Sequence, residues 1–300
     1  MKMKNILFEG CATALVTPFC DGGIDYSSFA ALIERQIAGG VEALVFCGTT
    51  GESPTVTDEE WESICRFAVK KVGGRAKVIV GCGSNSTACA AKRAEAATGY
   101  GADGLLVVTP YYNKASEDGL VVHYETVCKA TELPVILYNV PSRTGCDLNV
   151  PVCERLSEIG NVVGIKEASG SVSRAACIIS RLGGDLPLYS GCDELNLPLL
   201  SIGGAGFISV LSNVFPSECV RLFELVRSGK VGEASALSSL FYPFVSALFC
   251  EVNPIPVKTV LSHMGLCEER FRLPLSPISA SSRKRVIDAY EETVKRIAEN

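Results

Sequence analysis

The feature that most constrains the fold is a regular alternation of short apolar runs with amphipathic helical segments. The apolar runs predict strands at residues 12–19, 43–50, 77–83, 104–110, 134–140, 162–168, 186–192 and 205–211. A predicted helix follows each run, at residues 29–38, 57–72, 88–99, 117–131, 150–159, 171–182, 195–201 and 217–228. Eight strands that each precede a helix predict an α/β fold, a (β/α)8 TIM barrel, over residues 1–228. A doubly wound open sheet is the alternative, but it gives no reason for the repeat to stop at eight.

The chain continues beyond the eighth predicted helix. Further helices are predicted at residues 231–249, 256–264 and 282–299, and the Pro254-Ile255-Pro256 step marks a rigid break before the second of them. We expect residues 229–300 to form a C-terminal helical region that packs on the barrel.

Charge and hydropathy exclude several classes of partner. The net charge is −5 and the charged residues are interspersed, whereas a nucleic-acid-binding surface needs clustered lysine and arginine. The N-terminus lacks the apolar stretch of a signal peptide, and no apolar run is long enough to span a membrane. We therefore expect a cytoplasmic protein with neither nucleic acid nor membrane as a partner.

The cysteines and histidines do not predict a metal site or disulfides. Fourteen cysteines are scattered without a C-x-x-C pair, which is typical of small core hydrophobes in a reducing compartment. The two histidines have no partner at ligand spacing, so structural zinc is not expected. The glycine cluster at residues 81–86 lacks the third glycine of a dinucleotide fingerprint, and no P-loop occurs, so no cofactor is expected.

Lys166 ends a short and mostly β-branched run that is typical of a buried barrel strand. A lysine at this position can extend its ammonium group to water, which is the ordinary structural role. It can instead lie in a drier pocket, where the neutral amine is favoured and attacks carbonyl carbons to form a Schiff base. Taken alone, the position favours the first alternative, so the decision depends on the other strand ends.

Active sites of such barrels lie at the carboxyl ends of the strands. Here Thr49 and Thr50 lie between glycines whose backbone can converge on a small carboxylate, and the other predicted ends carry phenols and a guanidinium. Each side chain also has an ordinary structural interpretation as a turn cap, a core tyrosine or a surface charge. Together they supply what Schiff-base chemistry on a keto acid requires, namely Thr49, Thr50, Tyr112, Tyr138, Arg143 and Lys166.

With these residues the chain resembles the dihydrodipicolinate synthase family, within the pyruvate-dependent class I aldolase and N-acetylneuraminate lyase superfamily. The resemblance runs from about residue 10 to the end, and it rests on residues 48–52, 109–113, 138–145, 164–169, 206–210 and 253–258. It implies a lyase of lysine and diaminopimelate biosynthesis that condenses pyruvate with L-aspartate 4-semialdehyde. It also implies a homotetramer built as a dimer of dimers.

The resemblance assigns a role to each site residue. Lys166 forms the imine with pyruvate, and Thr50 links Tyr138 to Tyr112 in a proton relay. Tyr112 is expected to come from the neighbouring subunit. The substrate-binding set comprises Thr49 and Thr50 for the pyruvate carboxylate, Arg143 for the semialdehyde carboxylate, and backbone groups of Gly191 and Ile208 near Lys166.

Three other functions are alternatives to the synthase. A sialic-acid lyase or a sugar-acid aldolase of the same superfamily would use the same lysine and tyrosine, but Arg143 and the run Glu167-Ala168-Ser169 favour the synthase. A related retro-aldol or dehydratase role stays open. A non-catalytic binding barrel is expected to have lost a relay residue, and none is missing.

The resemblance also bears on feedback control by L-lysine. Lysine-sensitive relatives carry a glutamate where Cys89 stands, and a thiol with an ordinary pKa of about 8.5 offers almost no negative charge at neutral pH. We therefore expect weak or absent inhibition, although Asp58 could supply a carboxylate from another direction. The matching positions are Ser53, Pro54, Asp58, Trp61, Asn85, Cys89 and Tyr111.

Overall fold

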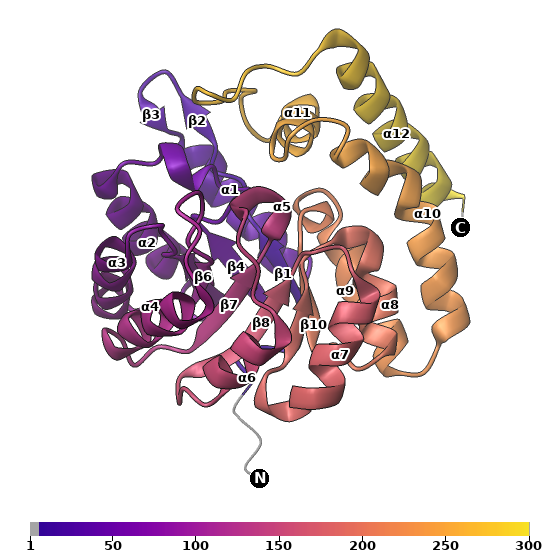
Figure 1. Ribbon diagram of the computed structural model, residues 1–300. Coiled ribbons are helices and arrows are strands. Elements are labelled where there is room, and N and C mark those ends of the chain that lie inside the picture. The colour runs from indigo at the N-terminus through magenta and orange to yellow at the C-terminus, as the bar shows by residue number, and fades with distance from the viewer. Residues whose placement is uncertain (1–5, 300) are drawn as a thin grey trace.

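Eight parallel strands close into a barrel in the computed structural model, which describes residues 6–299 (Figure 1). The strands are β1 (Gly10–Ala14), β4 (Ala43–Phe46), β5 (Lys77–Gly81), β6 (Gly104–Val108), β7 (Val135–Asn139), β8 (Val162–Glu167), β9 (Leu188–Ser190) and β10 (Gly206–Ser209). Neighbours along the chain are neighbours in the barrel, and β1 pairs with both β10 and β4 to close it. The predicted (β/α)8 barrel is confirmed, and the open sheet is excluded.

All eight predicted barrel helices are present. They are α1 (Tyr26–Ala38), α2 (Asp58–Val72), α3 (Thr87–Tyr100), α4 (Glu117–Lys129), α6 (Val150–Ser157), α7 (Val172–Leu182), α8 (Asn196–Ser201) and α9 (Pro216–Arg227). Capping chemistry explains several of the starts. Thr57 and Glu60 form a reciprocal capping box at α2, and the Asp25 carboxylate accepts the backbone N–H groups of Ser27 and Ser28 at α1.

The predicted strands extend too far at their carboxyl ends, and short elements were missed. The strand predicted at 12–19 ends at Ala14, and the one predicted at 43–50 ends at Phe46. The chain leaves β4 because Cys47 adopts a left-handed backbone with φ of 52°. The missed elements include the hairpin strands β2 (Phe19–Cys20) and β3 (Gly23–Ile24), the single-turn helix α5 (Pro141–Thr144) and short 3-10 helices.

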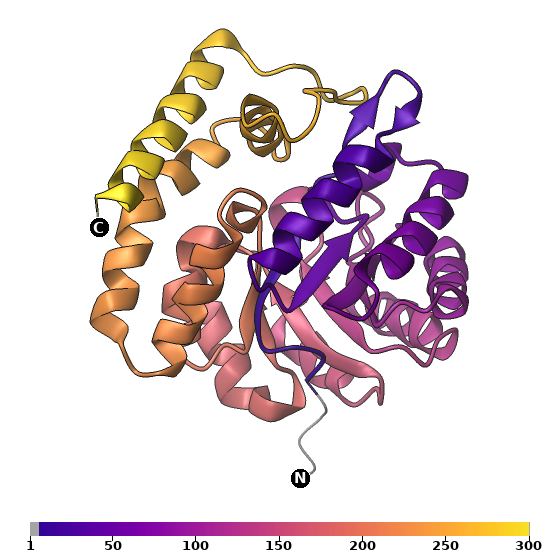
Figure 2. The same ribbon diagram turned by 180° about the vertical axis from the view of Figure 1, so that it is seen from behind.

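Three helices follow the barrel: α10 (Val231–Leu248), α11 (Ile255–His263) and α12 (Ala280–Ala298). Figures 1 and 2 show them arching along one side of the barrel, with α12 lying against α10. The segment before α12 reaches the tip of the β2–β3 hairpin, where Arg270 forms an ion pair with Asp21. The region is therefore held to the barrel at widely separated points.

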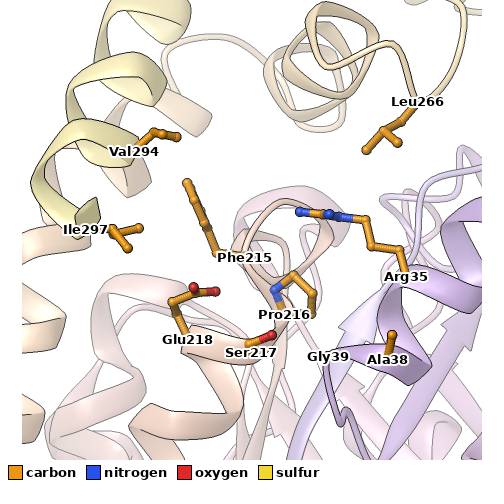
Figure 3. Close-up of a pocket in the computed structure, with 10 residues that line it drawn as sticks. All are labelled: Arg35, Ala38, Gly39, Phe215, Pro216, Ser217, Glu218, Leu266, Val294 and Ile297. Carbon is orange, nitrogen blue, oxygen red and sulfur yellow. The ribbon is translucent and has the colours of Figure 1, made fainter.

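A groove of about 590 Å³ lies between the barrel helices and α12 (Figure 3). Arg35 enters it from α1 and donates a hydrogen bond to the carbonyl oxygen of Val214, at 2.7 Å. Val294 and Ile297 form the opposite wall on α12. None of the predicted site residues lines this groove, so its volume alone does not identify a site.

The cysteines mostly follow expectation, since all fourteen are free and nine of them are buried. Cys20, Cys192 and Cys250 are partly buried, and Cys89 and Cys177 are exposed on helices. Across residues 6–299 no helix combines the length and apolar character needed to cross a membrane.

Candidate active site

Lys166 lies at the carboxyl end of β8 and is only 6% exposed. It pairs in register with Tyr138 of β7, and its Nζ atom lies 4.4 Å from the centroid of the Tyr138 ring. The side chain is therefore largely buried and does not extend freely into solvent. It is instead held over an aromatic face inside the barrel rim.

Gly191 makes room for the lysine side chain. A Cβ atom at this position would lie 2.9 Å from Cε of Lys166 and 2.7 Å from Cβ of Ala168, closer than real Cβ contacts allow. The backbone N–H of Gly191 donates to the carbonyl oxygen of Glu167, which fixes this close approach at 2.9 Å. The structure thus brings Gly191 against Lys166, while Ile208 lies on β10 in the interior cluster that includes Tyr138.

The side chain of Glu167 points to the opposite face of β8 from that of Lys166, and it anchors the strand ends. Its carboxylate accepts the backbone N–H of Ser169 at 2.6 Å, Nδ2 of Asn139 at 3.0 Å and Nε of Arg174 at 3.0 Å. These bonds tie β8 to β7 and to the start of α7. The position of Lys166 along the strand is consequently fixed by its neighbour.

The threonine pair lies in a tight turn after β4. The N–H of Gly51 and that of Ser53 both donate to the carbonyl oxygen of Gly48, at 3.1 and 3.3 Å. Thr50 is 3% exposed inside this turn, and Thr49 faces the cleft described below. The chain packs closely at Gly51, where a Cβ atom would lie 3.2 Å from Oγ1 of Thr17.

The C-terminal region contributes Asn253 to the same place. Its Nδ2 atom donates to Oγ1 of Thr50 at 3.0 Å, and its backbone carbonyl oxygen accepts a hydrogen bond from Nη2 of Arg143 at 3.4 Å. Asn253 is not among the predicted site residues, although it lies in the run 253–258 that carries the family resemblance. The available signal was the Asn-Pro-Ile-Pro step, where a rigid break places a polar side chain.

A buried ion pair joins the threonine turn to α11. Nζ of Lys258 lies 2.6 Å from Oε1 of Glu52, with side-chain exposures of 0% and 1%. Burial lowers the pKa of the Lys258 ammonium, and the Glu52 carboxylate acts in the opposite direction. Glu52 adopts a left-handed backbone with φ of 55°, which turns its side chain inward beneath the turn.

A cleft of about 290 Å³ opens beside these residues. Thr49 and Arg143 line it together, so hydroxyl and guanidinium donors face one small space that suits a carboxylate ligand. Lys166, Tyr138 and Thr50 are more deeply buried and do not line it. The remaining wall is formed by Tyr111, Val140, Thr144, Val252, Asn253, Pro254, Pro274 and Leu275, among others.

Among the predicted catalytic residues, Tyr112 is the exposed one, whereas Lys166, Tyr138 and Thr50 are buried. The Tyr112 side chain is 89% exposed, and its backbone has a left-handed φ of 77°. The backbone N–H donates to the carbonyl oxygen of Thr144 at 3.2 Å, which fixes the loop but leaves the phenol pointing away from the fold. Within residues 6–299 it makes no hydrogen bond to Thr50 or Tyr138.

At the positions that correspond to a lysine-binding pocket, the acidic group is already paired. Nη2 of Arg93 lies 2.7 Å from Oδ1 of Asp58, and this hydrogen bond lowers the pKa of the Asp58 carboxyl. The Arg93 guanidinium also lies 5.7 Å from the ring centroid of Trp61, whose Nε1–H donates to the carbonyl oxygen of Gly81. Cys89 is exposed on α3.

Comparisons with known proteins cover nearly the whole chain. The model of the Dihydrodipicolinate synthetase family matches residues 7–293. A 4-hydroxy-tetrahydrodipicolinate synthase of Alkaliphilus oremlandii is 45% identical over 286 residues, which are 95% of this chain and 99% of that protein.

Solved structures agree with the sequence relatives. The 4-hydroxy-tetrahydrodipicolinate synthase of Methylacidiphilum fumariolicum SolV is 41% identical with a TM-score of 0.96, and the match covers 97% of this chain and 98% of that one. The chloride-inhibited dihydrodipicolinate synthase of Acinetobacter baumannii, complexed with pyruvate, is 40% identical with a TM-score of 0.94. That match covers 96% of this chain and 99% of the other.

Proposed function

The chain belongs to the dihydrodipicolinate synthetase family, and from this premise we propose how its residues carry out the reaction. It is a lyase with 4-hydroxy-tetrahydrodipicolinate synthase activity, which condenses pyruvate with L-aspartate 4-semialdehyde on the route to lysine and diaminopimelate. We propose that the amine of Lys166 attacks the keto carbon of pyruvate and that the resulting carbinolamine loses water to form an imine. The burial of Lys166 against Tyr138 and Gly191 is the observation that carries this assignment.

The imine step uses the side chains around the lysine. Thr49 holds the pyruvate carboxylate through its hydroxyl and Thr50 through its backbone N–H, so that the Thr50 hydroxyl serves the relay. The protonated imine accepts electrons, so the pyruvate methyl group loses a proton and becomes an enamine nucleophile. Thr50, Tyr138 and Tyr112 carry that proton between the substrate and water. The proposal needs no metal ion and no cofactor.

The second substrate enters through the cleft. Arg143 binds the carboxylate of L-aspartate 4-semialdehyde and orients the aldehyde toward the enamine. After the new carbon–carbon bond forms, the amino group of the semialdehyde attacks the imine carbon, closes the ring and displaces Lys166. A coupled assay tests this choice of substrate beside N-acetylneuraminate and 2-keto-3-deoxy sugar acids. Faster turnover of either alternative would overturn it.

Replacing Arg143 by alanine is expected to raise the KM for the semialdehyde and to lower kcat. Loss of a charge-assisted carboxylate contact costs about 1.5–3 kcal/mol, or roughly ten- to a hundred-fold in kcat/KM. Steady-state kinetics gives this number, and borohydride trapping with pyruvate alone is expected to stay intact. Arg155→Ala is the control, because Arg155 is an exposed arginine paired with Asp118 on the surface. Equal failure of pyruvate trapping in Arg143→Ala would contradict the role.

We further propose a cytoplasmic homotetramer, a dimer of dimers, in which Tyr112 enters the site of the neighbouring subunit. The exposed phenol on a fixed loop supports this, because a relay residue needs partners that its own chain does not supply. Residues 1–228 form the catalytic barrel in this proposal. Residues 229–300 complete it, since Asn253 and Lys258 bond to the threonine turn.

Hybrid dimers test the placement of Tyr112. An inactive Lys166 variant mixed with a Tyr112→Phe variant is expected to recover part of the activity, because each hybrid dimer regains one complete site. Turnover is measured before and after subunit exchange. A mass label on one variant monitors how far the exchange has gone. If exchange is complete and turnover stays at the level of the separate variants, Tyr112 serves its own chain.

Inhibition by L-lysine is expected to be weak or absent. Cys89 supplies no carboxylate, and the carboxylate of Asp58 already forms an ion pair with Arg93. The ammonium group of a bound lysine would therefore lack a free carboxylate partner. Lysine titration at saturating and sub-saturating pyruvate measures the effect. Half-inhibition below about 1 mM, equivalent to roughly −4 kcal/mol of binding, would contradict the prediction. Cys89→Glu is expected to increase sensitivity.

A further inference from the structure

Asn253 is the residue through which the C-terminal region touches the threonine turn. It lies between α10 and α11, and it is 6% exposed. Its only side-chain hydrogen bond among the described residues is the one that Nδ2 donates to Oγ1 of Thr50, because its Oδ1 atom is buried without a partner. The carboxamide is thus oriented toward Thr50 and toward no other side chain.

The direction of this hydrogen bond limits what the Thr50 hydroxyl can do. A hydroxyl group has one hydrogen to donate and two lone pairs that accept. Asn253 occupies one lone pair, which leaves one acceptor position and the single hydrogen. Those two are the minimum that proton transfer through a hydroxyl requires, because Oγ1 must take up one proton and release another.

We propose that Asn253 is a positioning residue that sets the direction of proton transfer through Thr50. It donates Nδ2–H to Oγ1, so the Thr50 hydrogen is left free for the relay toward Tyr138. In each transfer Oγ1 receives one proton and gives up one, and the hydroxyl is restored. The inference rests on the proposed function, since it deepens the role that Thr50 has there.

A buried ion pair anchors the segment that carries Asn253 to the threonine turn. Pro254 follows directly and begins the turn into α11, whose Lys258 is paired with Glu52 two residues beyond Thr50. The bond between Asn253 and Thr50 and the bond between Lys258 and Glu52 therefore connect the same two segments. The ion pair thus helps to keep the backbone of Asn253 beside the threonine turn.

Exchange of the pyruvate methyl protons with D2O, followed by NMR, isolates the step in which the proton leaves. Asn253→Asp keeps the shape of the side chain but offers only acceptors, so it draws the Thr50 hydrogen away from the relay. We expect exchange at saturating pyruvate to slow by roughly ten- to a hundred-fold. Asn253→Ala removes the donor but adds no acceptor that attracts the Thr50 hydrogen. We therefore expect a smaller loss of exchange rate in this variant. A purely structural role would reverse this order, because alanine leaves a cavity.

Thr50→Val tests whether Asn253 acts through the hydroxyl. We expect the double variant Asn253→Asp/Thr50→Val to exchange no more than about two-fold slower than Thr50→Val alone, since coupled residues are not additive. The control is Asn161→Asp, which removes an amide that donates to the carbonyl oxygens of Thr131 and Leu133 at the far end of the barrel. Its exchange rate is expected to match that of the unsubstituted chain.

Four results separate the possible failures. An unchanged exchange rate in Asn253→Asp, or losses that multiply in the double variant, would overturn the inference alone. Slower exchange in Asn253→Ala than in Asn253→Asp would also overturn the inference, even if Asn253→Asp lowers the thermal stability. If the unsubstituted chain gives no borohydride-trapped adduct with pyruvate, the proposed function fails and this inference fails with it.

Discussion

Lys166→Arg is expected to lower kcat by roughly three orders of magnitude or more, which is typical of removing a covalent nucleophile. A guanidinium group stays protonated at any pH that the protein tolerates, so it cannot attack the keto carbon of pyruvate. Arginine keeps the positive charge and most of the length of the side chain. The loss would therefore report the missing nucleophile rather than a missing charge.

Borohydride reduction in the presence of pyruvate identifies the covalent residue directly. Mass analysis of the digested protein is expected to find the reduced adduct on the peptide that contains Lys166, and to find none in the Lys166→Arg variant. Lys77→Arg is the matched control, because Lys77 begins barrel strand β5 at the opposite end and pairs with Asp103 on the surface. An adduct on any other lysine, or no adduct, would disprove the proposed mechanism.

The barrel was predictable because its information is local and repeated. Each strand is a short apolar run and each helix has its own start signal, such as the capping box at Thr57 and Glu60, so errors at one element do not affect the others. The rim residues followed from the fold rule that function lies at strand ends. The structure places Tyr138 and Gly191 against Lys166, while the catalytic roles of these residues stay a prediction.

The contacts that complete the site were not predictable in this way. Thr50 and Asn253 are 203 positions apart, and Glu52 and Lys258 are 206 apart. No sequence periodicity connects residues so far apart. A glutamate that follows a glycine is expected to be an exposed turn residue, and only the folded chain brings a lysine next to it. The hairpin β2–β3 was not predicted, because a strand of two residues is too short to show an alternation of apolar and polar residues. The partners of Tyr112 are not in its own chain under our proposal.

The buried pair Glu52–Lys258 gives the largest expected effect on stability. Lys258→Met keeps a long side chain that can pack against Phe19, whose ring centroid lies 4.2 Å from Nζ of the lysine. It leaves the Glu52 carboxylate buried without its cation. Breaking a buried pair in this way costs about 3–5 kcal/mol of the free energy of unfolding. Urea denaturation at a fixed protein concentration measures the loss, because oligomerisation shifts apparent stability.

The pair itself is expected to contribute much less than this penalty. Burial lowers the pKa of Lys258, which shows that removing the ammonium from water offsets part of its attraction to Glu52. The double variant Glu52→Gln/Lys258→Met is therefore expected to regain most of the stability that Lys258→Met loses. Lys77→Met is the control, since an exposed pair contributes about 0–1 kcal/mol. If the double variant is as unstable as Lys258→Met, the cost lies in lost packing around the lysine rather than in the unpaired carboxylate.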